Sequence, residues 1–153
     1  MNRLLAALLA ATSFGIIGCA TGPAATSPAE VAYLDGIMKE AVEFDIPKEQ
    51  GDDAMGRAQV FIAKYGSMKI QTATNNVVDT YNVPQSNVLM PQSYGYKVLR
   101  ANIGDKAHIT IECFNGLEDA IISSAHAMPA RNARFLARYM HTGAIEHPEL
   151  IAK

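Results

Sequence analysis

Hydrophobic and polar positions change their period along this chain. In residues 28–44, apolar side chains recur three and four positions apart, as on one face of a helix. Ser27-Pro28-Ala29-Glu30 begins this stretch with a capping residue, a proline at the first helical position and a glutamate three residues after the cap. The pattern predicts a helix that runs to about Phe44 and is broken by Pro47.

A second helical pattern ends at Tyr65. It begins at Lys48 or at Asp52, and acidic residues suit the positive N-terminal end of a helix. Its apolar positions share one face: Met55, Ala58, Phe61, Ile62 and Tyr65. Gly66 is a typical residue to end such a helix.

From residue 68 the period becomes that of strands. Residues 68–72 alternate, residues 77–81 are rich in β-forming side chains, and Asn75-Asn76 between them offers a turn. This pattern fits either one long bent strand or a hairpin. Residues 82–93 contain two prolines and are predicted to form a loop.

Residues 94–101 and 106–114 are predicted to form a hairpin across the turn residues 102–105. In its second strand Ile109, Ile111 and Cys113 share one parity, so we expect them to face the helices. His108, Thr110 and Glu112 share the other parity and are expected to face away.

The last part of the chain returns to a helical period. Residues 117–128 fit either a loop or a weak helix. Pro129 is predicted to begin a closing helix that runs through Met140 or His141, with Gly143 as its C-cap. The tail, residues 144–153, is expected to pack as an irregular extension.

Together these elements predict an α+β fold. We expect a small antiparallel sheet of three or four strands, with two N-terminal helices and one C-terminal helix packed on one face. The other face of the sheet would be more exposed to water.

The first nineteen residues follow a different pattern. Arg3 precedes an apolar stretch that Thr12, Ser13 and Gly15 interrupt, and this stretch is shorter than the about 20 residues that cross a bilayer. Ile16-Ile17-Gly18-Cys19 resembles the lipobox of bacterial lipoprotein signal peptides. The resemblance implies diacylglycerol on the Cys19 thiol, cleavage before Cys19 and acylation of the new amino terminus. The alternative is an ordinary secreted protein in which Cys19 has no such role.

This resemblance divides the chain into three parts. Residues 1–18 form the signal peptide, residues 19–29 the lipidated cysteine and a flexible tether, and residues 30–153 one globular periplasmic domain. Residues 20–27, fully extended at about 3.3 Å per residue, reach only ~25–30 Å from the membrane. Ala20 stands where many Gram-negative lipoproteins of the inner membrane have aspartate, which implies the outer membrane.

A weaker resemblance extends into the domain. The segments Gly56-Arg57-Ala58-Gln59, Met68-Lys69-Ile70-Gln71, Thr80-Tyr81-Asn82 and Tyr94-Gly95-Tyr96 are similar to those of small uncharacterised lipoproteins of proteobacteria. This resemblance implies no activity.

Charge excludes one class of partner. The chain has 13 basic and 15 acidic residues and a net charge of −2. Loss of Arg3 with the signal peptide would lower this charge from −2 to −3. A nucleic-acid partner normally requires a basic face, so none is expected.

Titratable residues give few candidates for chemistry. His108 and Glu112 lie on one strand face and could share a metal ion, but a solvated face is the favoured interpretation because a metal normally needs further ligands. His141, Glu146 and His147 follow a helix end, where histidine ordinarily complements the helix dipole. We therefore predict no metal site, no cofactor and no catalytic residue.

Cysteine pairing depends on the anchor. If Cys19 carries lipid, Cys113 has no partner within the chain. A buried structural thiol is favoured over a reactive or intermolecular one.

Two groups of side chains are candidates for surface interactions. Tyr94 and Tyr96 share a strand face and could stack on a sugar or peptide group, or could instead pack under the helices. Arg131, Arg134 and Arg138 fall on one helical stripe with His141. This stripe would dock on phosphate head groups or an acidic partner, or else form a solvated face that pairs with Glu40 or Glu43.

These observations predict a lipid-anchored envelope protein of a Gram-negative bacterium with a non-enzymatic binding, accessory or structural role. Its partners would be the membrane, through the acyl chains of Cys19, and an envelope protein. The first alternative is a small-molecule or glycan-binding module that uses the open sheet face, and the second is an envelope hydrolase or metal enzyme.

Overall fold

The computed structural model describes residues 27–81, 93–115 and 123–152. The helices are α1 (Pro28–Ile37), α2 (Gly51–Tyr65) and α3 (Ser123–Thr142), with short 3-10 turns at η1 (Lys48–Gln50) and η2 (Pro148–Leu150). The strands are β1 (Glu43–Pro47), β2 (Ile70–Ala73), β3 (Val77–Thr80), β4 (Tyr94–Ile103) and β5 (Lys106–Asn115).

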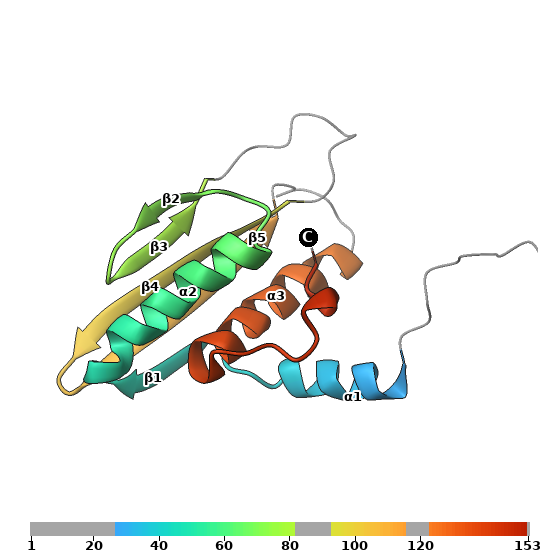
Figure 1. Ribbon diagram of the computed structural model, residues 1–153, viewed down its shortest axis with the longest axis horizontal. Coiled ribbons are helices and arrows are strands. Elements are labelled where there is room, and N and C mark those ends of the chain that lie inside the picture. Colours follow the sequence, from blue (N-terminus) through green and yellow to red (C-terminus); the bar gives the residue numbers. More distant parts are fainter. Residues whose placement is uncertain (1–26, 82–92, 116–122, 153) are drawn as a thin grey trace, which may run out of the picture.

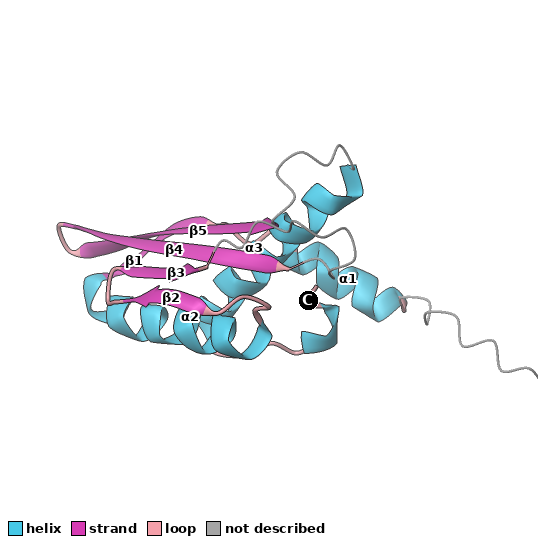
Figure 2. Cartoon of the chain, turned by 90° about the horizontal axis from the view of Figure 1, so that it is seen from above, coloured by secondary structure: helices cyan, strands magenta, loops and turns pink. Residues whose placement is uncertain are grey.

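The five strands form one antiparallel sheet in the order β1-β5-β4-β3-β2. Helices α2 and α3 lie side by side on one face of this sheet, and α1 lies against α3 (Figures 1 and 2). The α+β class and the antiparallel sheet are confirmed. The prediction of three or four strands is wrong because it omitted β1. Of the three helices predicted to pack on one face of the sheet, α2 and α3 do so, whereas α1 packs against α3.

The first helix is shorter than predicted. It has the expected capping box, in which Ser27 and Glu30 bond each other's backbone N–H groups, but it ends at Ile37 rather than near Phe44. Phe44 and Ile46 instead alternate with exposed residues in β1, which pairs with β5. Pairing with a strand distant in sequence overrode the local helical pattern, because it buries part of both side chains against the core.

The second helix and the central hairpin agree with the sequence pattern. The five apolar positions predicted for the inner face of α2 are all buried. Strands β4 and β5 pair across a turn in which Gly104 has a φ of 63°, a conformation that favours glycine. Ile109 and Ile111 are buried beneath the helices, as their parity predicted. Residues 70–80 form a hairpin of β2 and β3, which settles the alternative left open by the sequence.

Helix α3 begins before its predicted start. Its first residue is Ser123, and Pro129 lies inside it. Residues 123–128 are therefore helical. Residues 116–122, and residues 82–92 of the loop predicted at 82–93, lie outside the described part of the chain. The predicted C-cap is confirmed, since Gly143 has a φ of 74° and donates its N–H to the carbonyl of Tyr139 at 2.8 Å.

The tail packs onto the domain as an irregular extension, as predicted. Ile151 is buried in the core. Asn132 of α3 is buried and forms two hydrogen bonds with Ala152, donating to its carbonyl at 2.9 Å and accepting from its N–H at 3.1 Å. The end of the chain is thus tied to the middle of α3.

Candidate functional site

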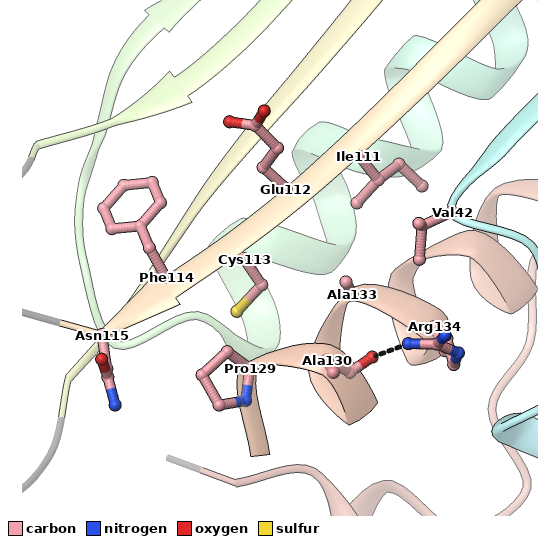
Figure 3. Close-up of a pocket in the computed structure, with 10 residues that line it drawn as sticks. All are labelled: Val42, Ile111, Glu112, Cys113, Phe114, Asn115, Pro129, Ala130, Ala133 and Arg134. Carbon is pink, nitrogen blue, oxygen red and sulfur yellow. Dashed lines mark hydrogen bonds between the residues drawn. The ribbon is translucent and has the colours of Figure 1, made fainter. Parts of the chain in front are cut away.

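A groove of about 490 Å³ lies between β5 and the first half of α3. We call it the β5–α3 groove (Figure 3). Three small or ring-shaped residues, Pro129, Ala130 and Ala133, form its helix side and leave space against the sheet. The other lining residues are Val42, Ile111, Glu112, Cys113, Phe114, Asn115 and Arg134.

The groove follows an edge of the sheet that is only half covered. Strand β1 pairs with β5 from Lys106 to Thr110, and one further bond joins the Ile111 N–H to the Val42 carbonyl at 2.8 Å. Beyond Ile111, no strand in the described part of the chain pairs with this side of β5. Within the part of the chain that the structure describes, residues 112–115 therefore form a free edge beside the groove.

The bonding pattern of β4 identifies the backbone groups on this edge. The Tyr96 N–H binds the Thr80 hydroxyl at 2.9 Å and the Arg100 N–H binds the Asn76 carbonyl at 2.8 Å, so these residues face β3. The backbone groups of the intervening β4 residues therefore face β5. In the observed register these residues lie opposite Thr110, Glu112 and Phe114, whose backbone groups they bond. Cys113 and Asn115 consequently direct their N–H and C=O groups toward the free edge, where no other described residue bonds them.

Arg134 and Arg138, two of the three predicted surface arginines, hold the residues before β1 away from the edge of β5. The Arg134 Nε donates to the Met38 carbonyl at 3.1 Å, and the Arg138 Nε donates to the Glu40 carboxylate at 2.6 Å. These bonds hold the connection between α1 and β1 against α3 instead of along β5. Two arginines of the predicted stripe thus bind other parts of the same domain. The alternative of pairing with Glu40 is confirmed for Arg138.

Arg134 retains capacity for a ligand. Its only other hydrogen bond within the described residues runs from Nη1 to the Ala130 carbonyl at 2.9 Å. No carboxylate of a described residue forms an ion pair with it, in contrast to Arg138. A half-buried positive charge therefore lies at one end of the groove.

Arg131 does not line the groove. Its Nε is buried and has no hydrogen-bond partner among the described residues. It lies near Tyr94, whose pKa is raised by burial and lowered to a smaller degree by the charge of Arg131.

The two predicted surface tyrosines lie in the core. Tyr94 and Tyr96 are 1% and 0% exposed and face the helices, so the alternative of packing under the helices is the one observed. The ring of Tyr96 contacts Phe61 edge-on at 5.9 Å between centroids. Stacking of a sugar or peptide on these two rings at the open sheet face is excluded by their burial.

Cys113 is a half-buried free thiol on the groove side of β5. Burial raises its pKa to about 12, so it stays protonated near neutral pH. Since the thiolate is the nucleophilic form, this environment disfavours reactivity. The predicted structural role is consistent with this position.

Three histidines with described side chains, His108, His141 and His147, are engaged in local contacts. His141 lies edge-on to the ring of Phe44 at 4.2 Å, and His147 bonds the Glu149 carboxylate at 2.9 Å. His108 bridges β5 and β1, with Nδ1 at 2.7 Å from Asp45 and Nε2 at 3.0 Å from Glu43. Within the described residues, no group of three or more His, Cys, Asp or Glu is arranged to hold a metal ion.

This bridge makes the attachment of β1 dependent on pH. Both His108 nitrogens donate to carboxylates only in the imidazolium form, and these bonds raise the pKa of His108 above its usual 6.5. The stabilisation is fully present below pH 6.5 and is lost as the pH rises through the higher folded-state pKa. Urea unfolding between about pH 5 and 9 should show wild type losing its advantage over His108→Gln as the pH rises. Parallel pH profiles of the two proteins would contradict this assignment.

Sequence reasoning missed the groove itself. Several lining residues have side chains that give no sign of a binding site in the sequence: Val42, Pro129, Ala130 and Ala133. Ala130 and Ala133 are nevertheless small residues three positions apart on one helix face. Such spacing leaves room beside a sheet, and it is the one local sign of the groove.

Neither a membrane-spanning helix among the described residues nor a relative identifies the chain. No described helix is long and apolar enough to cross a membrane. Cys19 lies outside the described residues. A scan against protein-family models and searches among curated proteins and solved structures gave no significant match.

Proposed function

We propose that this chain is a lipid-anchored protein of a Gram-negative envelope, held at the periplasmic face of the outer membrane, whose domain binds a protein partner without catalysing a reaction. The proposed anchor is Cys19, supported by the resemblance of Ile16-Ile17-Gly18-Cys19 to a lipobox and by Ala20 after it. Several acyl chains on one residue would hold the protein firmly, whereas one chain gives only marginal binding.

The observation that carries the binding role is the free edge of β5 beside the β5–α3 groove. An uncovered edge presents unpaired backbone N–H and C=O groups, and an added strand satisfies them. The adjacent groove supplies apolar contacts for the side chains of such a strand. Backbone bonding and side-chain packing are then available at the same place.

The titratable groups of the groove favour binding over chemistry. Glu112 has the strand parity of the open sheet face, and its carboxylate points away from Cys113 (Figure 3). The Cys113 thiol is protonated near neutral pH because of its burial. Arg134 offers hydrogen-bond donors and no acceptor.

Photocrosslinking in intact cells tests this proposal. A photoreactive phenylalanine analogue is placed at Asn115, on the free edge, or at Val60, which is 52% exposed on α2. We expect a discrete adduct with one envelope protein from position 115 and none from position 60. The same adduct from both positions, or none from position 115, would contradict a partner at this edge.

A further inference from the structure

As far as the described residues line it, the β5–α3 groove is closed at one end and open at the other. At the closed end, Val42 already occupies the edge position opposite Ile111 through their 2.8 Å hydrogen bond. At the open end lie Asn115 and Pro129 (Figure 3). A chain added along β5 from the open end therefore meets Val42 after bonding Asn115 and Cys113.

The direction of the added chain decides which of its ends reaches Val42. Strand β1 is antiparallel to β5, with its N-terminal residue Glu43 opposite Thr110. A chain added along the same edge and running in the direction of β1 would lie opposite residues 115 to 112 of β5. Its C-terminal end would therefore meet Val42. An internal segment would have to turn outward there, whereas a chain terminus simply stops.

The charge at the closed end matches a carboxylate. Arg134 lies at the same end of the groove as Val42 (Figure 3). Its guanidinium bonds two backbone carbonyls, which leaves its charge unneutralised by any described carboxylate and leaves donors unused. Arginine binds carboxylates through short, charge-assisted hydrogen bonds.

We infer that the β5–α3 groove binds the C-terminal peptide of a partner protein as an added antiparallel strand, with the peptide's terminal carboxylate on Arg134. This inference rests on the proposed function and specifies the partner's binding segment. The peptide backbone bonds the edge groups of Cys113 and Asn115. An apolar side chain close to the terminus packs among Ile111, Ala130 and Ala133.

Residues 151 and 152 of a second copy of this chain are unsuited to the role. Ile151 is 4% exposed in the core, and Ala152 forms two hydrogen bonds with Asn132. Releasing this segment would break those contacts. The occupant named by the inference is the C-terminus of a different protein, and a second copy is an outcome of the test.

The probe is a display library of random peptides with free C-termini, selected on the full-length protein in detergent micelles. Selected sequences are synthesised as the C-terminal acid and as the amide, and their Kd values are measured by fluorescence anisotropy. Loss of a charged hydrogen-bond partner should weaken the amide by about tenfold or more. Concentration-dependent dimerisation that competes with the peptide would instead indicate a second copy and overturn the inference.

Two arginine variants separate recognition from fold. Arg134→Gln should bring the ratio of amide to acid Kd close to one, and Arg134→Lys should restore part of it. Arg138→Gln is the matched control, because Arg138 also clasps the connection between α1 and β1 but does not line the groove. It should keep the wild-type ratio.

Two variants at Asn115 test the added strand. Asn115→Pro removes an N–H that faces the free edge, so it removes no bond to β4 and should abolish peptide binding. Asn115→Ala keeps that N–H and should bind like wild type. Circular dichroism confirms that both variants are folded.

The outcomes distinguish this inference from the proposed function. If the acid and amide forms of a peptide bind with equal Kd and Asn115→Pro abolishes their binding, the peptide is added as a strand but its terminal carboxylate is not recognised by Arg134. Binding that survives both Asn115→Pro and Arg134→Gln would overturn the groove as the peptide site. A library that yields no binder overturns the inference, while the photocrosslink from position 115 still decides the proposed function.

Discussion

Replacing Cys19 with serine is expected to abolish lipid attachment and to leave the segment 1–18 on the protein. The proposed lipid is joined through sulfur, and a serine hydroxyl does not replace the thiol in that reaction. Membrane affinity from acyl chains amounts to about 0.8 kcal/mol per buried CH₂, so their loss removes the permanent anchor. The effect should be all or none rather than graded.

Metabolic labelling with an alkyne fatty acid measures this effect directly. Wild type should incorporate the label and shift to the smaller size expected after cleavage, whereas Cys19→Ser should do neither. Cys113→Ser is the matched control because it removes the other cysteine of the chain and leaves Cys19 in place. Label retained in Cys19→Ser would show that the lipobox interpretation is wrong.

The elements that could be predicted from the sequence are those with a sustained period and local partners. Helix α2 repeats its apolar face over four turns, and β4 and β5 are joined by a tight turn that sets their register. Strand parity then correctly placed Ile109 and Ile111 under the helices. In these elements local preference and tertiary packing agree.

Strand β1 could not be predicted in this way. Its five residues follow a helix, and the helical pattern of residues 28–44 extends into the start of the strand. Its partner β5 lies far along the chain, with Glu43 opposite Thr110. Only this distant pairing decides the matter, and a local pattern contains no information about it.

The candidate site depends on the same distant pairing. Helical geometry placed Arg134 and Arg138 on one stripe, but the path of the connection between α1 and β1 determines what they bind. Within the described residues, the free edge exists because β1 begins only at Glu43 and the arginines hold the preceding residues against α3. Individual side chains could therefore be predicted, whereas the groove between them could not.

The largest loss of stability is expected from Phe61→Ala in α2. Phe61 is 0% exposed, and its ring lies at centroid distances of 5.1 Å from Tyr65, 5.9 Å from Tyr96 and 5.7 Å from Tyr139. The substitution removes the centre of this aromatic cluster and leaves a cavity between α2, α3 and the sheet. The free energy of unfolding should fall by about 3–5 kcal/mol.

Val60→Ala is the matched control for this loss. Val60 precedes Phe61 in the same helix but is 52% exposed, so truncating its side chain creates no internal cavity. The change also replaces a β-branched residue with a better helix former. Its free energy of unfolding should stay within about 0.5 kcal/mol of wild type. Urea unfolding of the three proteins measures both values. Equal losses for the two variants would mean that α2 does not present Phe61 to the sheet, and the positions of α3 and of the β5–α3 groove would then have to be revised.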